Sequence, residues 1–374
     1  MEGLGGQWFG PYSGSNAGKA LIDIDDMGAF YEISGYLYDN NNGLPSSSVF
    51  FRTSDKRVKF TASVDIRPID PRSQEPTSRD NVTTIFPGVT FPSTADVVFN
   101  CDRDSLKIEW LTDIGTHGAA ELPRSRAGEL SEYVPSRTIR NWSKFKEFAS
   151  SIEPDRYVFR GQSSNKWRLR TTFHRTGRAN LVRFLGSDIP ILWKNLSAIT
   201  KHVFDFSKPE EHAAFVSLVQ HHGYPTPLLD WTHSPFIAAF MAYHTITNKT
   251  AMEKTKDRVR IIVLDKKEWS GLRQVGKLSP MWPHMSLLDP ISIENARMIP
   301  QQALSTVTNM DDVESYIRST EAAMNKSFLQ MIDLPVRDRP SVMRELSLMG
   351  ITAGSLFPGL DGACEELKER FFRI

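Results

Sequence analysis

QHHGYPTPLLDWTHSPFIAAFMAYH, residues 220–244, is the stretch that decides the fold of the second half of the chain. A helix ends at its two histidines, a strand follows in LLDW, and Ser234 with Pro235 starts a helix rich in small apolar residues. Polar side chains crowd the turns between these three elements. Polar groups held at the mouth of a helix are typical of a binding site, so we expect one here.

A Phe-Arg-Gly tripeptide at residues 159–161 ends an earlier predicted strand, RYVFRGQ. Together with the pattern Q-H-x-G-x-P-T-x-L-L-D-W-T-x-S-P that begins at Gln220, it resembles the FRG domain family. The resemblance implies an FRG domain over residues 136–374, because the segment 349–367 also looks like the end of such domains. It implies nothing about the residues before that range.

The first part of the chain has a different pattern, in which short β-branched and aromatic segments are separated by Gly, Pro, Asn and Asp. In RVKFTASVDIRPI, Phe60, Val64 and Ile66 share one face, as in a half-solvated antiparallel sheet. We predict an all-β small barrel or sandwich, a recognition domain of residues 1–135, before the α+β FRG domain. Its expected strands are residues 19–25, 47–53, 57–69, 96–102 and 106–113, with a connector over 115–131.

Helical periodicity appears after Pro135. Apolar side chains recur at helical spacing after Asn141, and Ser143 is the expected N-cap of that helix. Alternating helices and strands predict an α+β region. Its expected elements are helices over residues 142–152, 210–221, 340–349 and 364–372, and a strand over 259–265.

Length and composition set broad limits. A chain of 374 residues is longer than one hydrophobic core usually spans, so two domains are expected. The 45 Lys and Arg residues balance 44 Asp and Glu, so net charge neither favours nor excludes a nucleic-acid partner. Cys101 and Cys364 are expected to be reduced, buried thiols of a cytoplasmic protein. We expect no signal peptide and no contact with a membrane, since no stretch is long and apolar enough to span one.

Residues 166–183, KWRLRTTFHRTGRANLVR, are rich in Lys and Arg and contain no acidic residue. A solvated surface beside a strand is the interpretation that we favour. The alternative is a basic face that follows the phosphates of a nucleic acid.

Arg160 is the first candidate site residue, with Gly161 and Gln162 beside it. A guanidinium binds a phosphate or carboxylate through two hydrogen bonds, and an adjacent glycine lets a ligand lie against the main chain. The alternative is a structural ion pair of Arg160 with Asp230 or Glu294.

Asp230, Trp231, Thr232 and Ser234 form a second group, at a predicted helix N-terminus whose free N–H groups favour anions. A structural alternative exists, in which Asp230 or Thr232 caps the helix and Trp231 fills the core.

The pair His221 and His222 suggests a metal, but zinc needs two further ligands that no Cys or His spacing supplies. No metal is therefore predicted. We expect one histidine to interact with the C-terminus of its helix and the other to hydrogen-bond in the site. General-base catalysis with Asp230, as in a hydrolase, stays open, although no G-x-S-x-G or catalytic cysteine motif accompanies it.

A strand ending in aromatic-Arg-Gly, and a second strand leading into Thr-x-Ser before an Ala-rich helix, resemble the first two motifs of ADP-ribosyltransferases. The resemblance implies a nicotinamide dinucleotide (NAD) as substrate, with Thr232 and Ser234 shaping its pocket. The dinucleotide-binding residues that it implies are Arg160, Gly161, Gln162, His221, His222, Asp230, Trp231 and Arg297.

The third transferase motif usually supplies a catalytic Glu, and residues 294–305, ENARMIPQQALS, are its nearest equivalent. Glu294 is the only carboxylate there, while Gln301 and Gln302 stand where an acid is expected. We expect the segment to return to Arg160, so that Glu294 or Gln302 orients the ribose. The implied catalytic set is Arg160, Thr232, Ser234, Glu294 and Gln302.

The predicted function is an ADP-ribosyltransferase-like enzyme of the kind found in toxins and antiviral defence, with RNA, DNA or protein as acceptor. An antitoxin or another protein is a further expected partner. The alternative is a non-catalytic nucleotide- or nucleic-acid-binding module. Salt dependence separates the two, since phosphate contacts weaken steeply with ionic strength and a buried small-ligand pocket does not.

Overall fold

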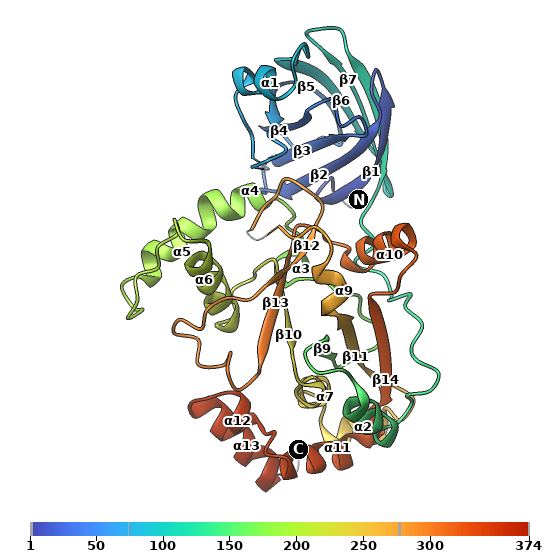
Figure 1. The fold of residues 1–374 in the computed structure, drawn as a ribbon, viewed down its shortest axis with the longest axis vertical. Coiled ribbons are helices and arrows are strands. Elements are labelled where there is room, and N and C mark those ends of the chain that lie inside the picture. The colour runs from blue at the N-terminus through green and yellow to red at the C-terminus, as the bar shows by residue number, and fades with distance from the viewer. Residues whose placement is uncertain (1–2, 74, 276–277, 373–374) are drawn as a thin grey trace.

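The computed structural model describes residues 3–73, 75–275 and 278–372. A β-barrel lies at one end of the molecule, and a larger region of mixed helices and sheet lies at the other (Figure 1). The chain passes between them through an extended segment after β8. The predicted order, β structure first and α+β structure second, is confirmed.

Eight antiparallel strands close the barrel, in which each strand pairs with its neighbours in sequence and the first pairs with the last. Closure gives every strand a neighbour on both sides, although β4 and β5 pair only between residues 46–49 and 66–69. Helix α1 (Arg79–Ile85) lies in the connection between β5 and β6. The strands are β1 (Gly6–Gly14), β2 (Gly18–Asp26), β3 (Tyr31–Asp39), β4 (Ser46–Arg52), β5 (Lys59–Ile69), β6 (Thr94–Cys101), β7 (Ser105–Thr112) and β8 (His117–Pro123).

Alternation along the strands separates the barrel interior from its surface. In β5, Val64 and Ile66 are buried in the barrel core, whereas Asp65 and Arg67 are exposed, as the sequence predicts.

Three strands, β1, β3 and β8, lie outside the expected set. The expected connector over residues 115–131 is wrong in its first part, because that part is β8, and β3 was also not anticipated. The sequence of β8, HGAAELP, has no β-branched or aromatic residue to mark it as a strand. Pairing with β7 and β1 decides its conformation instead.

The mixed region is built on an antiparallel sheet of six strands in the order β12-β13-β10-β9-β11-β14. Its strands are β9 (Tyr157–Gln162), β10 (Leu228–Thr232), β11 (Arg258–Asp265), β12 (Met285–Leu288), β13 (Ala303–Thr308) and β14 (Leu329–Pro335). Its helices are α2 (Trp142–Ser151), α3 (Thr172–Arg175), α4 (Leu181–Arg183), η1 (Phe184–Asp188), α5 (Ile189–Leu196), α6 (Pro209–His221), α7 (Pro235–Tyr243), α8 (Asn248–Glu253), α9 (Lys266–Ser270), α10 (Val313–Met324), η2 (Val336–Asp338), α11 (Arg339–Leu348), α12 (Ala353–Leu356) and α13 (Leu360–Phe372).

The expected helices and the strand over 259–265 are all present, within a few residues at their ends. The N-cap of α2 differs from the expectation. Asn141, not Ser143, adopts the extended conformation, and its side chain accepts a hydrogen bond from the Lys144 amide at 2.9 Å.

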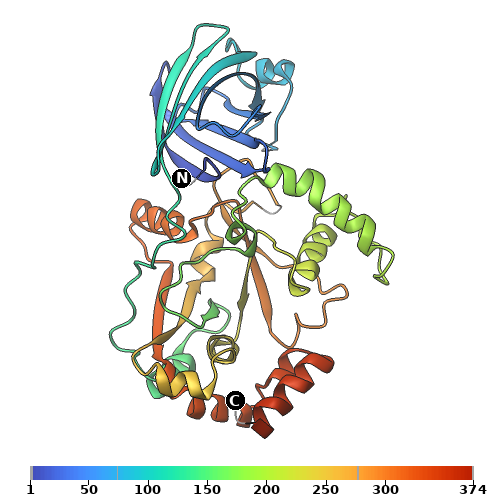
Figure 2. The same cartoon turned by 180° about the vertical axis from the view of Figure 1, so that it is seen from behind.

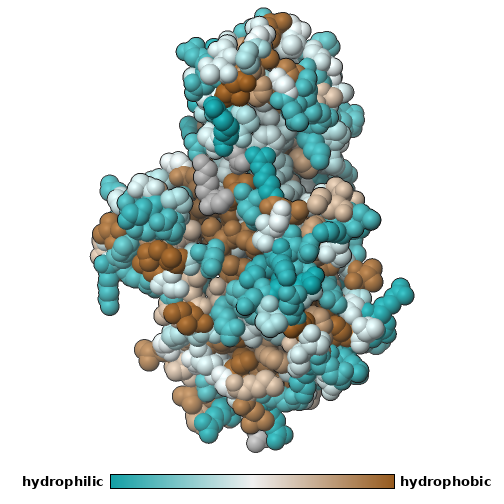
Figure 3. All heavy atoms as spheres, viewed as in Figure 1, coloured by the Kyte–Doolittle hydropathy of each residue, from teal (hydrophilic) through white to brown (hydrophobic). Residues whose placement is uncertain are grey.

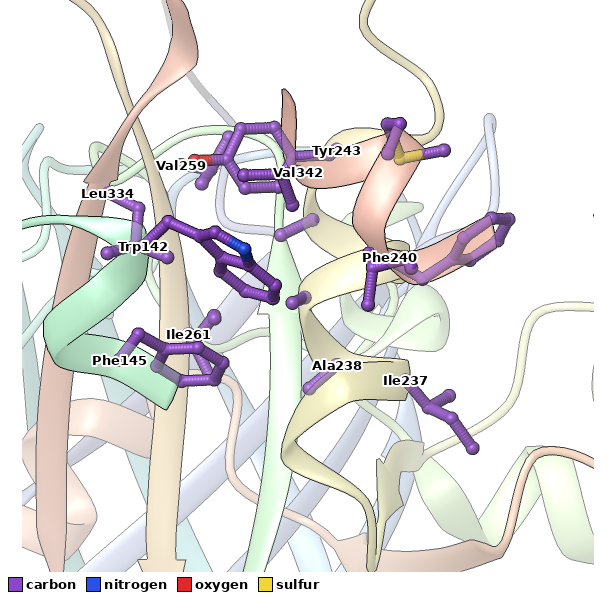
Figure 4. Close-up of a cluster of buried hydrophobic side chains, with 14 of the residues drawn as sticks. Trp142, Phe145, Ile237, Ala238, Phe240, Tyr243, Val259, Ile261, Leu334 and Val342 are labelled. Atoms are coloured by element: carbon purple, nitrogen blue, oxygen red, sulfur yellow. The ribbon is translucent and has the colours of Figure 1, made fainter. Parts of the chain in front are cut away.

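Helices α2, α7 and α11 cover one face of β9, β11 and β14, and their side chains form one apolar cluster (Figure 4). Trp142 and Phe145 of α2 stack with ring centroids 5.4 Å apart, and Ile261 of β11 lies beside them. Ala238 of α7 faces the same sheet (Figure 4). This packing fixes α7, and with it the turn that precedes α7, relative to β9.

The barrel rests on the mixed region through the outer face of β2 and β3, and the space-filling view shows the two parts in continuous contact (Figures 2 and 3). Tyr38 stacks on Trp282 with ring centroids 4.7 Å apart. The buried Asp25 carboxylate accepts from Arg178 Nε at 3.0 Å and from the backbone amides of the next two residues. A domain boundary at residue 135 stays a prediction.

Only part of the basic segment 166–183 is a solvated surface: Lys166 and Arg175 are exposed, whereas other cations of the segment are paired inside the molecule. The Arg168 side chain is 1% exposed and lies 2.9 Å from Asp312, and Arg170 lies 2.5 Å from Asp311. Asp311 and Asp312, which lie far from the segment in sequence, neutralise these two arginines. Because they are paired, Arg168 and Arg170 are not free to bind the phosphates of a nucleic acid.

Cys101 is buried in the barrel, as expected, but Cys364 is exposed on α13. Most of α13, Cys364 included, lies on the surface. None of the described helices has both the length and the apolar content to cross a bilayer.

Asp23 of β2 is fully buried at the contact between barrel and mixed region. Its Oδ1 accepts from Gln7 Nε2 at 2.9 Å, and its Oδ2 has no hydrogen-bond partner in the described ranges of the chain. Burial raises the pKa of the carboxyl well above its usual range, and the nearby Asp25 and Asp311 raise it further, against the effect of Gln7. At a pH between the ordinary pKa and the raised one, the folded protein therefore keeps the Asp23 proton, whereas the unfolded chain has released it. The stability that this provides is complete below the ordinary pKa and is lost as the pH rises through the raised folded-state pKa.

We expect Asp23→Asn to stabilise the protein at pH 8 by roughly 1 kcal/mol or more, because a neutral amide is buried without the proton uptake that the carboxylate requires at that pH. The gain should shrink toward acid pH, where both side chains are neutral. Urea denaturation at a series of pH values measures it, with the exposed Asp96→Asn as control. A gain that does not change with pH would contradict the proposed protonation.

Candidate functional site at the fork between β9 and β10

Strands β9 and β10 are adjacent in the sheet but pair at one residue pair only, Phe159 with Thr232. On its other side, β9 pairs with β11 along its whole length. Beyond the single pair the two strands separate, and we call this place the strand fork. The Arg160 side chain bridges it, because its Nη1 donates to the Asp230 backbone oxygen at 2.6 Å. The structure thus brings together Arg160 and the start of the 230–234 segment, which lie far apart in sequence.

The Arg160 guanidinium retains unused hydrogen-bonding capacity. Within the described part of the chain, its Nε is buried without a partner, and so is Oε1 of Gln162, which lies on the same face of β9 two residues later. Burial lowers the pKa of Arg160, the Asp230 carboxylate opposes that shift, and the nearby Arg175 adds to it. Burial also lowers the pKa of Arg175, with a further contribution from Arg170. The desolvated Arg160 guanidinium, close to the positive charge of the exposed Arg175, favours an anion there.

Gly161 has a different role from the one we expected. A Cβ at this position would lie 2.0 Å from the Ala238 backbone oxygen and 2.6 Å from the Ala242 nitrogen, both in α7. Glycine is therefore needed so that α7 can pack directly on β9. The residue faces the helix, not a ligand.

Gln220 organises the turn between α6 and β10. Its Nε2 donates to Asp230 Oδ1, and its Oε1 accepts from the Thr226 hydroxyl. Ser305 of β13 also donates to Asp230 Oδ1, at 3.4 Å. These contacts hold the Asp230 carboxylate beside the fork. The pattern that begins at Gln220 does not by itself indicate this role, and no local motif marks Ser305 as a partner of Asp230.

Much of the 231–234 segment is satisfied internally. Trp231 is 2% exposed and donates through Nε1 to Thr306 Oγ1 at 3.0 Å, so its ring has almost no surface to offer a ligand. Thr232 donates to the Gln301 backbone oxygen at 2.7 Å. Ser234 is the N-cap of α7 and accepts from the Ile237 amide. The structural alternative therefore accounts for most of the polar groups in this cluster. The residue that caps α7 is Ser234, and not Asp230 or Thr232.

The two histidines occupy different environments. His222 is exposed and its amide caps the C-terminus of α6, while His221 is half-buried and its Nδ1 pairs with the Asn295 side-chain amide. Burial lowers the pKa of His221, with Asp230 opposing. Arg297 donates to the His221 backbone oxygen at 3.2 Å and stacks on Phe357. Among the described residues, no group of three or more His, Cys, Asp or Glu side chains is arranged to hold a metal ion.

A comparison with protein-family models gives one match, over the residues that build both sides of the fork. Residues 155–251 match the FRG domain. The match includes β9, α6, β10 and α7, and so contains Arg160 and the whole pattern that begins at Gln220. The sequence-based resemblance to the FRG domain is confirmed for this range. The wider range of 136–374 stays a prediction.

Other comparisons add little to the FRG domain match. No curated protein matches the chain. Among solved structures, a redesigned β-barrel is similar to it, at 12% identity, with 33% of this chain and 92% of that chain covered and a TM-score of 0.23. A likeness at this TM-score carries no functional meaning.

The 294–302 segment lies outside the FRG domain match but returns to it. The Gln301 and Gln302 backbone oxygens accept from the Thr232 hydroxyl and the His233 amide. The side chains point elsewhere: Gln301 Nε2 donates to the Leu356 backbone oxygen at 3.0 Å, and Gln302 is exposed. Glu294 is also exposed, and its carboxylate accepts from the His202 amide. The structure thus brings the main chain of this segment to the site without placing the Glu294 carboxylate on Arg160.

Proposed function

We propose that the FRG domain binds a nicotinamide dinucleotide at the strand fork and transfers its ADP-ribose group to a macromolecule. The observation that carries the proposal is the Arg160 guanidinium, whose Nε is buried at the fork and meets no partner among the residues that the structure describes. A diphosphate supplies the acceptor that such a guanidinium lacks, and Arg175 adds a second positive charge nearby. Gln162 Oε1, also buried without a partner, is available to a donor of the ligand, such as a ribose hydroxyl.

In the reaction, the bond between the ribose C1′ and the nicotinamide nitrogen breaks, and nicotinamide leaves with the bonding electrons. A nucleophile of the acceptor forms the new bond to C1′ and releases its proton. Thr232 and Ser234 position the turn before α7, and orientation of the ribose by Gln302 or Glu294 requires that one of these exposed side chains turns toward the fork when the dinucleotide binds. Both of these last residues have left-handed backbone conformations, with φ of 46° and 53°. Such strain in a non-glycine residue is concentrated at functional sites, which supports a constraint on this segment.

Binding and turnover need separate measurements. Isothermal titration of the full chain with NAD should give saturable binding, and chromatography should detect nicotinamide release when a cell lysate is added. With labelled NAD, the label should then appear in either the protein or the nucleic-acid fraction, which identifies the acceptor.

Two results would change the proposal. Saturable binding without nicotinamide release, in the presence of lysate, would replace transfer by the non-catalytic binding module. An absence of NAD binding would overturn the site itself.

A further inference from the structure

The barrel encloses a cavity of about 170 Å³ that is independent of the strand fork. Its wall is mainly apolar and includes side chains such as Ile22, Leu37, Val49, Ile66 and Ile108. An eight-stranded barrel has an interior just wide enough to be filled by side chains or to hold one small ligand. An apolar cavity of about 150 Å³ is already large enough for benzene.

Small residues at inward positions leave this space open. Gly35, Ala20, Ala95 and Ala120 all line the cavity, from four different strands. Larger side chains at these positions would have filled the interior, as close packing normally requires. Aromatic rings also line it, including Phe51, Phe99 and Trp110. The size and lining of the cavity suit a flat ring or a short hydrocarbon chain.

Polar groups gather at the end of the barrel where the β1–β2, β3–β4 and β7–β8 turns meet. Tyr12 donates to Asp39 Oδ2 at 3.3 Å, and Ser15 Oγ lies 3.3 Å from His117 Nδ1; all four residues line the cavity. Burial raises the pKa of Tyr12, with Asp39 adding to the shift, so its hydroxyl stays neutral. Ser15 and His117 are exposed, so a ligand can enter from solvent without separating the barrel from the mixed region.

We infer that the barrel binds a small uncharged, mainly apolar molecule with one hydrogen-bonding group, such as a hydroxyl, directed at this polar rim. The Asp39 carboxylate accepts a hydrogen bond from a hydroxyl and repels a carboxylate. The preferred ligand class is therefore a small phenol or alcohol, and not a fatty acid or another organic anion.

The test uses ligand-observed NMR titrations of the full chain with phenol, toluene and benzoate. We expect phenol to bind most tightly, toluene less tightly, and benzoate weakest. Ala120→Leu fills the cavity and should weaken phenol binding about tenfold or more. The matched control is Ala119→Leu, because Ala119 is the next residue of β8 and is exposed on the outside. Ala95→Leu, on β6, repeats the cavity-filling change if Ala120→Leu does not fold.

Three outcomes would overturn the inference. They are no binding of phenol or toluene by the folded wild-type protein, an equal loss in the inward and outward alanine variants, and benzoate bound as tightly as phenol. None of them depends on NAD, so they leave the proposal for the FRG domain untouched.

Discussion

Gly161→Ala should cost about 3 kcal/mol or more of the free energy of unfolding, at the upper end of what overpacking usually costs. The reason is the 2.0 Å distance from the added Cβ to the Ala238 backbone oxygen. A backbone oxygen in the middle of α7 cannot move aside like the end of a flexible side chain. The helix must therefore lift from β9, which opens the apolar cluster of Figure 4. Against a typical total stability of about 5–15 kcal/mol, such a loss puts folding at risk.

Urea denaturation and circular dichroism measure this effect. The control is Gly186→Ala, because a Cβ at Gly186 would meet nothing within 4 Å. We expect that variant to keep wild-type stability or to gain slightly, since its glycine lies in a helical segment. A stable Gly161→Ala protein would show that α7 does not need close contact with β9.

Arg160→Ala should leave the fold largely intact and weaken NAD binding by about tenfold to hundredfold. In the structure, the side chain makes one hydrogen bond, to a backbone oxygen, so its removal costs the fold only about 1 kcal/mol. Hydrogen bonds from a guanidinium to a diphosphate are worth about 1.5–3 kcal/mol, which sets the expected loss of affinity.

Arg160→Lys separates charge from geometry. Lysine keeps the positive charge but lacks the planar guanidinium, so we expect an affinity for NAD between those of wild type and Arg160→Ala. The matched control is Arg57→Ala, an exposed arginine paired with Asp55 in the barrel. Unchanged NAD affinity in a folded Arg160→Ala protein would exclude the role. A large loss of stability would instead favour a structural one.

The sequence predicted the helices of the mixed region better than its sheet. Helix α6 and the start of α7 follow from helical spacing and from a Ser-Pro pair, which are local signals. Strands β13 and β14 did not stand out, because their identity depends on pairing with β10 and β11. The same holds for β8, whose small residues suit the barrel interior but carry no β propensity.

At the candidate site, the sequence located the right segments but misjudged what individual residues do. Arg160 and Asp230 do meet, through a backbone oxygen and not through an ion pair. Gly161 was linked to a ligand because glycine permits close approach, and the approaching group is helix α7. The hydrogen bond of Thr232 depends on Gln301, a partner that folds in from a distant segment, whereas Gln220 bonds to Thr226 and Asp230 of its own stretch. No spacing rule reveals a partner as distant as Gln301.

The order of strands in the sheet has a consequence for how this domain passes between proteins in evolution. The matched residues 155–251 contain only β9 and β10, which share a single pair, while β11 and β13, their main partners, come later in the chain. A gene segment limited to the match would encode two strands with exposed edges and half a core. Inheritance of the Arg160 site must therefore carry the chain at least through β13, and through β14 if β11 is to be paired on both sides. The segment that matches the FRG domain is therefore shorter than the segment that must be inherited together for the sheet to form.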